Sequence, residues 1–450
     1  MLEYLHKYSH LFCARFKRKR REIMQTKFIE GGVCAPSGFT ANGIHCGLKP
    51  SRTTNDLALI FCDTMCASAG IFTSNRVKAE CVKLTQKNLE GGKMQAAICN
   101  VCFANACTGS EGYKNAERMA QAAASSLGLN PENIIVCSTG IIGQQIPVEK
   151  IEQNISRLVK GLSKENHAEA RSAIMTTDTQ FKECAVETEI GGKKIRIGGM
   201  CKGSGMIHIN MGTMLSFLTT DCAITSQMLH LALKKSAAIT YNCVSIDGDT
   251  STNDTLTIMA SGKADNTEIT EEGEDFEKFL SALNKLNTVL AMKIAADGEG
   301  ASRLVECTVR GAASEEIARG IAKSVIKSNL VKAAMFGRDA NCGRILCAMG
   351  YSGFDFTVEK TCVYFSSRQT SLRFFDEQED FQIGSENDAE KIEVIHNGVG
   401  LAFDEEKATK ILSAEAVEIE VVLQDGNAQG KAWGCDLTYD YVKINGDYRS

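Results

Sequence analysis

The stretch 202–222, KGSGMIHINMGTMLSFLTTDC, lies near the middle of the 450-residue chain and changes character at Gly212-Thr213. Glycine, serine and methionine dominate its first half, whereas an apolar run typical of a buried strand follows Thr213. No turn signal separates the two halves. A loop is therefore expected to run directly into a buried strand at this point.

A threonine at such a junction can serve as a nucleophile if a base lies beside its hydroxyl. Cleavage of the preceding peptide bond would free the α-amino group of Thr213, whose pKa of about 7.7 to 8.0 suits that role. The residue before the threonine must be small so that the hydroxyl can reach the preceding carbonyl, and Gly212 meets this requirement. An ordinary junction remains the alternative from these residues alone, since Gly-Thr before an apolar run is common.

The composition is that of a globular protein with a sizeable buried core. Hydrophobic residues make up 44% of the chain and charged residues 23%, close to average usage. A formal charge of −5 gives no overall signature for nucleic acid or anionic lipid. No uninterrupted apolar run is long enough to cross a bilayer. We therefore expect small-molecule substrates, with neither nucleic acid nor a membrane as partner.

Residues 1–27 form a basic extension, and its cationic cluster is RFKRKRR at 15–21. The extension can be drawn as an amphipathic helix, as in a mitochondrial transit peptide, but Glu3, Glu22 and a shortage of serine oppose this interpretation. We expect a disordered or helical extension on a cytoplasmic protein, with a mitochondrial location as the alternative.

The 19 cysteines are expected to be mostly reduced and buried, because the chain shows no export signal. Cys99-x-x-Cys102, with Cys107 nearby, could be half of a zinc or iron–sulfur site. A second pair at matching spacing is missing, so core thiols are the favoured interpretation.

Other cofactor patterns are incomplete. The seven histidines show no metal-ligand spacing, and Gly203-Ser204-Gly205 lacks the third glycine of a dinucleotide fingerprint. The segment DGDTSTND (247–254) begins like a calcium loop but has Thr252 where glycine is required, which favours a polar hairpin turn. We expect neither a metal nor a bound cofactor.

Strand and helix patterns alternate along the whole chain. Periodicity and turn signals predict a hairpin at 183–199 that turns at Gly191-Gly192, and two strands within 242–260. The remaining strands are expected at 56–63, near 93–100, 303–311 and 330–337, and the helices at 114–129, after Pro147, and at 225–238, 274–295 and 314–328. This mixture predicts an α/β (α+β) protein with layered sheets covered by helices.

A set of motifs in a defined order extends across the chain from about Gly32 to the last residue. It resembles the glutamate N-acetyltransferase / ornithine acetyltransferase family of arginine biosynthesis. The matching stretches are GGVCAPSGFTANGI, DLALI, AGIFTSNRVKAECV, NACTG, CSTGIIGQQIP, IMTTDTQFKECAV, KGSGMIHINMGTML, SIDGDTSTNDT, GEGASRLVECTVRG and AWGCDLTYDYVKINGDYRS.

The resemblance implies an N-terminal-nucleophile-like α/β/β/α sandwich, made as a precursor that cleaves itself between Gly212 and Thr213. The products would be an α chain ending at Gly212, ordered over 28–212, and a β chain 213–450 with a β-rich C-terminal part, assembled as an α2β2 heterotetramer. Thr213 would take the acetyl group of N-acetylornithine and pass it to glutamate. Some members of the family also accept acetyl-CoA as a substrate.

The resemblance also implies roles for individual residues. Thr108 and Gly109 match the pair that forms the oxyanion hole, where each donor is worth roughly 100- to 1000-fold in rate. The positions that match substrate contacts are Thr176, Lys202, Thr213, Glu299, Asn445 and Ser450.

This chain departs from the family pattern at several positions. Where the family usually has Asn-Ser-Gly-Asn-Ala-Asn, this chain has NVCFAN at 100–105, so Cys102 replaces a glycine and Phe103 an asparagine. Gly212 replaces an alanine at the expected cleavage site, and Ser450 replaces a terminal threonine. Two alternatives follow: an aminopeptidase or amidase of the same fold, and a catalytically impaired family member that binds ligands or scaffolds other proteins.

Overall fold

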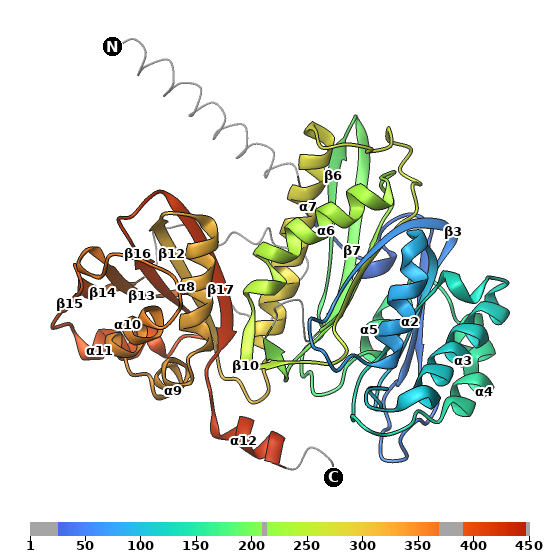
Figure 1. Ribbon diagram of the computed structural model, residues 1–450, viewed down its shortest axis with the longest axis horizontal. Helices are drawn as coiled ribbons and strands as arrows, with labels where there is room; N and C mark the ends of the chain where they lie inside the picture. The colour runs from blue at the N-terminus through green and yellow to red at the C-terminus, as the bar shows by residue number, and fades with distance from the viewer. Residues whose placement is uncertain (1–25, 209–213, 369–389, 447–450) are drawn as a thin grey trace.

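The computed structural model describes residues 26–208, 214–368 and 390–446. Within them the chain forms a large sheet folded into two layers, a two-stranded sheet and a separate six-stranded sheet (Figure 1). The basic extension up to residue 25, the expected cleavage site Gly212-Thr213, and Ser450 lie outside the described residues.

The large sheet takes strands from both sides of Gly212-Thr213. Its order is β1-β6-β7-β9-β11-β3-β4-β5, with β2 also paired to β3. The strands are β1 (Lys27–Ile29), β2 (Phe39–Ile44), β3 (Leu57–Phe72), β4 (Lys93–Asn100), β5 (Ile134–Ser138), β6 (Glu183–Ile190), β7 (Lys193–Lys202), β9 (Leu215–Thr220) and β11 (Thr255–Ala260).

The long strand β3 connects the two layers. Its first part pairs with β2 and β4, whereas its last part pairs with β11. Successive side chains of a strand face opposite sides, and in β4 Ala97 and Cys99 face one core while Ala96 and Ile98 face another. The first of these cores also receives Phe217 of β9, so it lies between the two layers.

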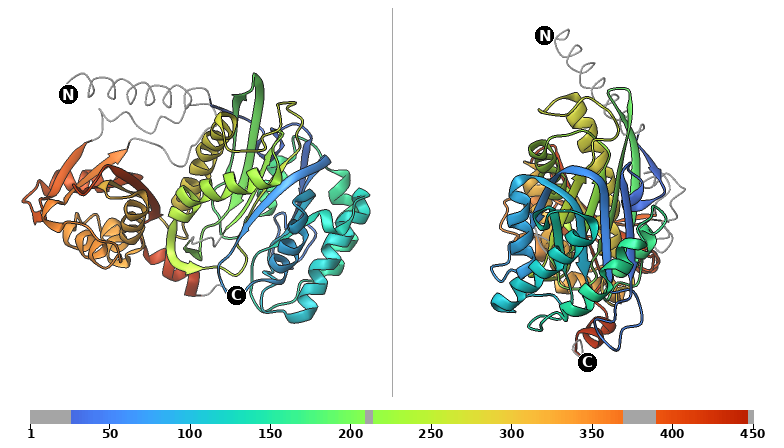
Figure 2. Two further views of the ribbon diagram at one scale, coloured as in Figure 1. Left: turned by 45° about the horizontal axis from the view of Figure 1, so that its top comes forward. Right: turned by 90° about the vertical axis from the view of Figure 1, so that its right-hand side faces the viewer.

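Helices cover both outer faces of this double layer. On one side α2 (Glu80–Asn88), α3 (Gly109–Leu127) and α4 (Val148–Lys160) pack on the half that contains β4 and β5, and on the other α6 (Ser226–Ile239) and α7 (Glu274–Ala296) cover the half that contains β7 and β9. The left view of Figure 2 shows the strands between these two groups of helices. The predicted α/β/β/α sandwich is thereby confirmed.

The six-stranded sheet follows in the order β15-β14-β13-β16-β12-β17. Its strands are β12 (Leu304–Ala312), β13 (Cys362–Arg368), β14 (Lys391–His396), β15 (Val399–Gly400), β16 (Ala416–Val422) and β17 (Ala428–Cys435). The helices of this part are α8 (Glu315–Lys327), α9 (Asn329–Gly337), α10 (Cys342–Gly350), α11 (Glu405–Leu412) and α12 (Tyr439–Gly446). One apolar core runs from α6 and α7 into this sheet.

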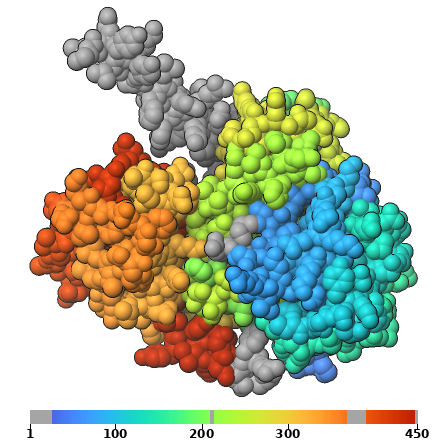
Figure 3. Space-filling model, viewed as in Figure 1, coloured from blue at the N-terminus to red at the C-terminus, as the bar shows by residue number. Residues whose placement is uncertain are grey.

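The two-stranded sheet consists of β8 (Ile207–His208) and β10 (Ser245–Thr250), and α5 (His167–Ala173) packs on β2 and β3. Figure 3 shows the red segment that contains α12 at the lower edge of the molecule, below the boundary between the orange and green segments. Within the described ranges, no helix has the length and apolar character needed to cross a membrane.

Local signals predicted many elements correctly. The hairpin between β6 and β7 turns at Gly191 and Gly192, whose φ angles are 57° and 74°, as a tight turn requires. Helix α3 ends at Gly128, which adopts the left-handed conformation with φ 72°.

The strand expected at 330–337 is wrong, because this segment is helix α9. Ser328 caps the helix by accepting a hydrogen bond from the Val331 N–H, and Val331, Ala334 and Met335 share its buried face. That spacing is helical, and the cap satisfies an N–H that would otherwise be unpaired.

The polar hairpin turn expected at 247–254 is also wrong. The strands on either side do not pair with each other, since β10 pairs with β8 whereas β11 pairs with β9 and β3. The segment between them, 251–254, instead crosses from one sheet to the other.

Candidate active site

A cavity of ≈ 430 Å³ lies where the loops at the ends of the central strands converge. Ala104, residues 139–142, 176–177, 251–253, and residues of the 202–206 segment line it, together with Glu299 and Asn445. These segments come from both sides of the expected cleavage site. Four of the predicted substrate positions, Thr176, Lys202, Glu299 and Asn445, are among the lining residues.

The charged groups of the cavity wall are largely withdrawn from solvent. Lys202 ends β7 and is 9% exposed, and Glu299 is 7% exposed. Asn445 of α12 donates from Nδ2 to Oε2 of Glu299 over 2.8 Å. A cation and an anion in one cavity suit a ligand that itself carries both charges.

A glycine allows the two walls of the cavity to approach each other. A Cβ added to Gly205 would lie 2.2 Å from Oε2 of Glu299, so any larger residue there would displace the Glu299 carboxylate. The backbone N–H of Glu299 donates to the Ser204 carbonyl over 2.9 Å. The segment 202–206 is thus held directly against Glu299.

Beneath the cavity, Lys182 forms a fully buried clamp with two carboxylates. Its Nζ lies 2.7 Å from Oδ1 of Asp178 and also pairs with Asp297. Burial opposes the charged form of Asp178, but Lys182 and Lys202 outweigh it and hold the pKa of that carboxyl well below its usual range. For Lys182 burial is likewise outweighed by the two carboxylates, and its pKa is raised.

The clamp fixes the backbone of three segments that form the cavity. Asp178 accepts hydrogen bonds from the N–H groups of Thr176 (3.0 Å) and Gly203 (2.7 Å). Asp297 accepts from the N–H groups of Thr179 and Gln180. The clamp therefore joins 176–180, 203 and 297 across the expected cleavage site, and the sequence interpretation missed it.

The predicted oxyanion residues lie in a separate, ordered loop. Thr108 precedes α3, is 8% exposed and donates from Oγ1 to Asn105 Oδ1 over 2.8 Å, while its carbonyl accepts from Gln145. Gly109 has φ 61°. Neither residue is among those that line the cavity, whereas Ala104 of the same loop is.

Hydrogen bonds to a neighbouring segment hold the loop around Cys102 in place. Cys102 adopts φ 76°, a conformation that costs a side-chain-bearing residue on the order of 1–3 kcal/mol. The loop is tied to 139–141, since the N–H of Ile141 donates to the Cys102 carbonyl and the N–H of Ala104 to the Ile141 carbonyl, both over 3.0 Å. Phe103 pairs with Thr139 and Ile141 as isolated β-bridges.

Of the three thiols at 99, 102 and 107, Cys99 alone is buried as the sequence suggests, since Cys102 is only half-buried. Cys99 packs in the core between the two layers and is 1% exposed, whereas Cys107 is exposed. Burial raises the pKa of the Cys99 thiol. Cys99 is therefore a core thiol.

Residues 252–254 are a second feature that sequence reasoning missed. Asn253 donates from Nδ2 to the carbonyls of Ala104 and Ser138, the latter over 2.8 Å. The N–H of Thr255 donates to the carbonyl of Met214 over 2.9 Å. Burial raises the pKa of the Asp254 carboxyl well above its usual value. This crossing segment therefore connects the oxyanion loop to the residue that follows Thr213.

His208 is the last described residue before the expected cleavage site. Its Nδ1 lies 3.0 Å from Oγ of Ser245. Burial, and then Lys323 and Lys327, lower its pKa to about 4. The imidazole is therefore neutral at physiological pH.

The comparisons with known proteins agree with the order of the motifs. The model of the ArgJ family matches residues 40–450. The "Arginine biosynthesis bifunctional protein ArgJ" of Caldanaerobacter subterraneus subsp. tengcongensis is 43% identical over 424 residues, which cover 94% of this chain and 100% of that protein. The "Arginine biosynthesis bifunctional protein ArgJ 1" of Clostridium acetobutylicum is 46% identical over 412 residues, 92% of this chain and 96% of that protein.

Solved structures of similar proteins each match part of this chain. A chain of the arginine biosynthesis bifunctional protein from Bacillus halodurans is 42% identical, with a TM-score of 0.44, and covers 51% of this chain and 97% of its own. A chain of the ornithine acetyltransferase from Mycobacterium tuberculosis, described as complexed with ornithine, is 36% identical, with a TM-score of 0.37, and covers 40% and 97%. Both TM-scores lie below 0.5, so these two structures do not establish the fold. The α/β/β/α arrangement of helices and sheets in this structure does. The family match and the nearly full-length relatives establish that this chain belongs to the ArgJ family.

Proposed function

We propose that this protein is an acyltransferase of arginine biosynthesis that moves the acetyl group of N-acetylornithine to glutamate through an acetyl-Thr213 intermediate. The observation that carries the proposal is the cavity in which Lys202, Glu299 and Asn445 converge from both sides of Gly212-Thr213. Membership of the ArgJ family supports the reaction class.

The charges of the cavity match those of the substrates. N-acetylornithine and glutamate each carry at least one carboxylate and one ammonium group. Lys202 offers a cation for the carboxylate, and Glu299 offers an anion for the ammonium, with Asn445 orienting its carboxylate. Because both charges are more than nine-tenths buried, a substrate that pairs with them replaces the water that they would otherwise need.

The proposed reaction proceeds in two half-reactions. The free α-amine of Thr213 takes the hydroxyl proton, Oγ attacks the acetyl carbonyl, and the oxyanion is stabilised by Thr108 and Gly109. Collapse of the tetrahedral intermediate breaks the C–N bond, and the amine of ornithine leaves with the proton. Glutamate then attacks the acetyl ester through its own amine and restores Thr213. We also propose acetyl-CoA as a second acetyl donor.

Autocleavage between Gly212 and Thr213 is compatible with the order of the sheet. Strands β9 and β11 follow the cleavage site, and they lie between β7 and β3, which precede it. Hydrogen bonds along both borders of this pair of strands would keep the two products together after cleavage. We propose that the products form the α and β chains of an α2β2 heterotetramer.

Intact-mass measurement tests whether the chain cleaves itself before Thr213 and whether Thr213 is the nucleophile. For the wild type we expect two fragments divided at Gly212/Thr213, and for Thr213→Ala a single uncut chain without acetyltransferase activity. Thr219→Ala is a matched control, since Thr219 lies on β9, which follows the expected cleavage site, and donates to the Val33 carbonyl in the core. A wild type that stays uncut yet transfers acetyl groups would overturn the mechanism.

Product analysis separates the transferase from an amidase. Incubation with N-acetylornithine and excess glutamate should yield acetylglutamate, and free acetate should stay a minor product. Free acetate as the main product, unaffected by glutamate, would support the amidase instead. Acetyl-CoA in place of N-acetylornithine tests the second donor in the same assay.

A further inference from the structure

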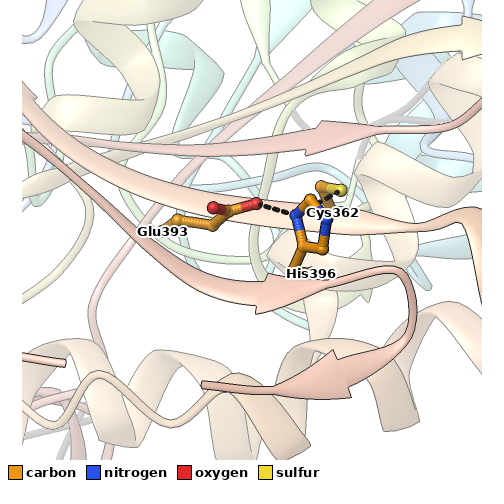
Figure 4. A group of neighbouring side chains, drawn as sticks. All are labelled: Cys362, Glu393 and His396. Atoms are coloured by element: carbon orange, nitrogen blue, oxygen red, sulfur yellow. Dashed lines mark hydrogen bonds and ion pairs between the residues drawn. The ribbon is translucent and has the colours of Figure 1, made fainter. Parts of the chain in front are cut away.

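Three side chains on the six-stranded sheet bring one sulfur, one nitrogen and one oxygen together. They are Cys362 of β13 and Glu393 and His396 of β14, and in Figure 4 the imidazole of His396 lies between the carboxylate and the thiol. Nδ1 of His396 is 2.8 Å from Oε1 of Glu393 and 3.8 Å from Sγ of Cys362. Among the residues that the structure describes, this is the one group of three such side chains whose ligand atoms lie within 4.8 Å of one another.

A β-bulge places Glu393 and His396 on the same face of the sheet. In a regular strand, side chains three residues apart point to opposite faces. Here Val363 pairs with Ile395 but Tyr364 pairs with Glu393, so the register shifts by one residue within β14. The bulge turns Glu393 toward His396, and re-aiming a side chain in this way is a common use of bulges near functional sites.

A tight turn directly after His396 fixes the backbone position of this residue. Asn397 and Gly398 have φ angles of 49° and 77°, and they connect His396 to its partner Val399 across a two-residue hairpin. This tight turn fixes His396 opposite Cys362.

The separations suit a tetrahedral zinc ion. Zinc binds thiolate at about 2.3 Å and imidazole at about 2.0 Å, which at a tetrahedral angle puts sulfur and nitrogen about 3.5 Å apart. The observed 3.8 Å is close to this distance. The imidazole and the carboxylate must separate by about 0.5 Å to admit the ion, and His396 has room to move because 55% of its side chain is exposed.

A neighbouring tyrosine can orient the carboxylate. Tyr364 donates from its hydroxyl to Oε1 of Glu393 over 3.0 Å. Hydrogen bonds of this kind, one step away from the ligand atoms, fix ligating side chains and raise metal affinity. Cys362 is 6% exposed, so the group combines a buried thiol with an imidazole that solvent can reach.

We propose that Cys362, Glu393 and His396 form a zinc site that clamps β13 to β14, independent of the acetyl-transfer cavity. Binding replaces the proton of the Cys362 thiol, which leaves to solvent, and the metal takes Nδ1 of His396 in the tautomer that carries its proton on Nε2. Water completes the four-coordinate shell. None of the three residues lines the acetyl-transfer cavity, and no sequence motif reveals the site because Cys362 lies far along the chain from the other two.

The full-length protein, first treated with a chelator and dialysed, can be titrated with Zn²⁺ and with Co²⁺ as a spectroscopic probe. We expect one zinc ion per chain and a sulfur-to-cobalt charge-transfer band in the near ultraviolet. Zinc should also raise the thermal unfolding temperature, because it binds the native state alone. Tyr364→Phe should weaken zinc binding by about 10- to 100-fold.

Cys362→Ser should abolish the charge-transfer band, and His396→Gln should remove the stoichiometric zinc. Cys347→Ser is the matched control, because Cys347 is a free, exposed thiol on α10 of the same part of the molecule, and it should keep both properties. If Cys362→Ser fails to fold, His396→Gln at the exposed position carries the test. A band that survives in Cys362→Ser would place the cobalt on another thiol, stoichiometric zinc retained by His396→Gln would exclude the imidazole as a ligand, and a wild type that binds no stoichiometric zinc would show a metal-free ion pair. Each of these results would overturn the proposal.

Discussion

Two groups of ion pairs in this molecule have different structural roles. The Lys182 clamp is fully buried and holds three backbone segments through its carboxylates. Arg118 instead joins the exposed faces of α3 and α4, where it pairs with Glu149 (2.9 Å) and Glu152 (2.6 Å) and is 38% exposed. Both groups join one cation to two carboxylates, so the comparison isolates the effect of burial.

Burial makes the clamp costly to form and costly to break. Removing a charge from water is unfavourable, and the attraction within a buried pair offsets this only while all partners are present. At the surface, water solvates whatever is left unpaired. We infer that the clamp sets the geometry of the cavity, whereas the Arg118 group adds little to either stability or activity.

The largest effect is expected for Lys182→Met. It leaves two buried carboxylates without their cation and should lower the free energy of unfolding by about 3–5 kcal/mol. Urea denaturation measures the change, and the acetyl-transfer rate should fall with it because Thr176 and Gly203 lose their fixed acceptor. A second substitution, Asp178→Asn, should restore part of the stability but not the rate. If Lys182→Met were as stable as the wild type, the clamp would not be the structural element described here.

A smaller effect is expected for Asp297→Asn, which keeps the shape but removes one charge. Lys182 retains Asp178 as its partner, so the loss should be about 1.5–3 kcal/mol, the range for a hydrogen bond to a charged group. KM for both substrates should rise together, since the Asp297 carboxylate holds the backbone of 179–180 and also pairs with Lys182, which positions Asp178. Steady-state kinetics and denaturation on the same preparation measure the two effects. An unchanged KM would show that the clamp does not determine how the cavity binds its substrates.

The effect expected for His208 lies between those of the buried clamp and the exposed Arg118 group, since its side chain is only partly buried. Its folded pKa of about 4 lies below the usual value of about 6.5, so below pH 6.5 the unfolded chain binds a proton that the folded chain does not. Stability should therefore fall as the pH drops from about 6.5 to about 4 and then lose this dependence. His208→Gln should flatten that part of the profile in urea titrations at a series of pH values. An identical slope in the variant would show that His208 is not the responsible group.

The smallest effect is expected for Arg118→Ala, the exposed counterpart of Lys182→Met. Exposed ion pairs contribute about 0.2–1 kcal/mol, and high salt should reduce even that difference. Acetyl transfer should be unaffected. If its effect on stability equalled that of Lys182→Met, burial would not explain the difference between the two groups.

The sequence predicted those features that depend on local signals. The glycine pair at 191–192 and the periodicity of 274–295 each predicted one element correctly. By contrast, the segment 330–337 was wrongly predicted as a strand, since its short apolar run fits either structure until the cap at Ser328 is considered. Short apolar runs carry this ambiguity in general.

The candidate site was predicted through the family resemblance, and the rest of it depends on distant contacts. Thr176, Lys202, Glu299 and Asn445 do meet in one cavity, although no spacing rule connects them. Lys182 and Asp297 look like ordinary charged residues until the fold places them together. The role of Thr213 stays a prediction, as it lies outside the described residues.

The position of β3 has a consequence for the order of events during synthesis. This early strand can complete its pairing only with β11, which the ribosome makes much later. Long-range pairing of this kind slows folding and delays it until both partners exist. If the chain cleaves itself as proposed, the uncut precursor must fold first, because cleavage before residue 260 is made would leave two fragments with unpaired sheet edges. The proposed cleavage would then occur only after the large sheet has formed, so that completion of the fold would determine when the nucleophile is released.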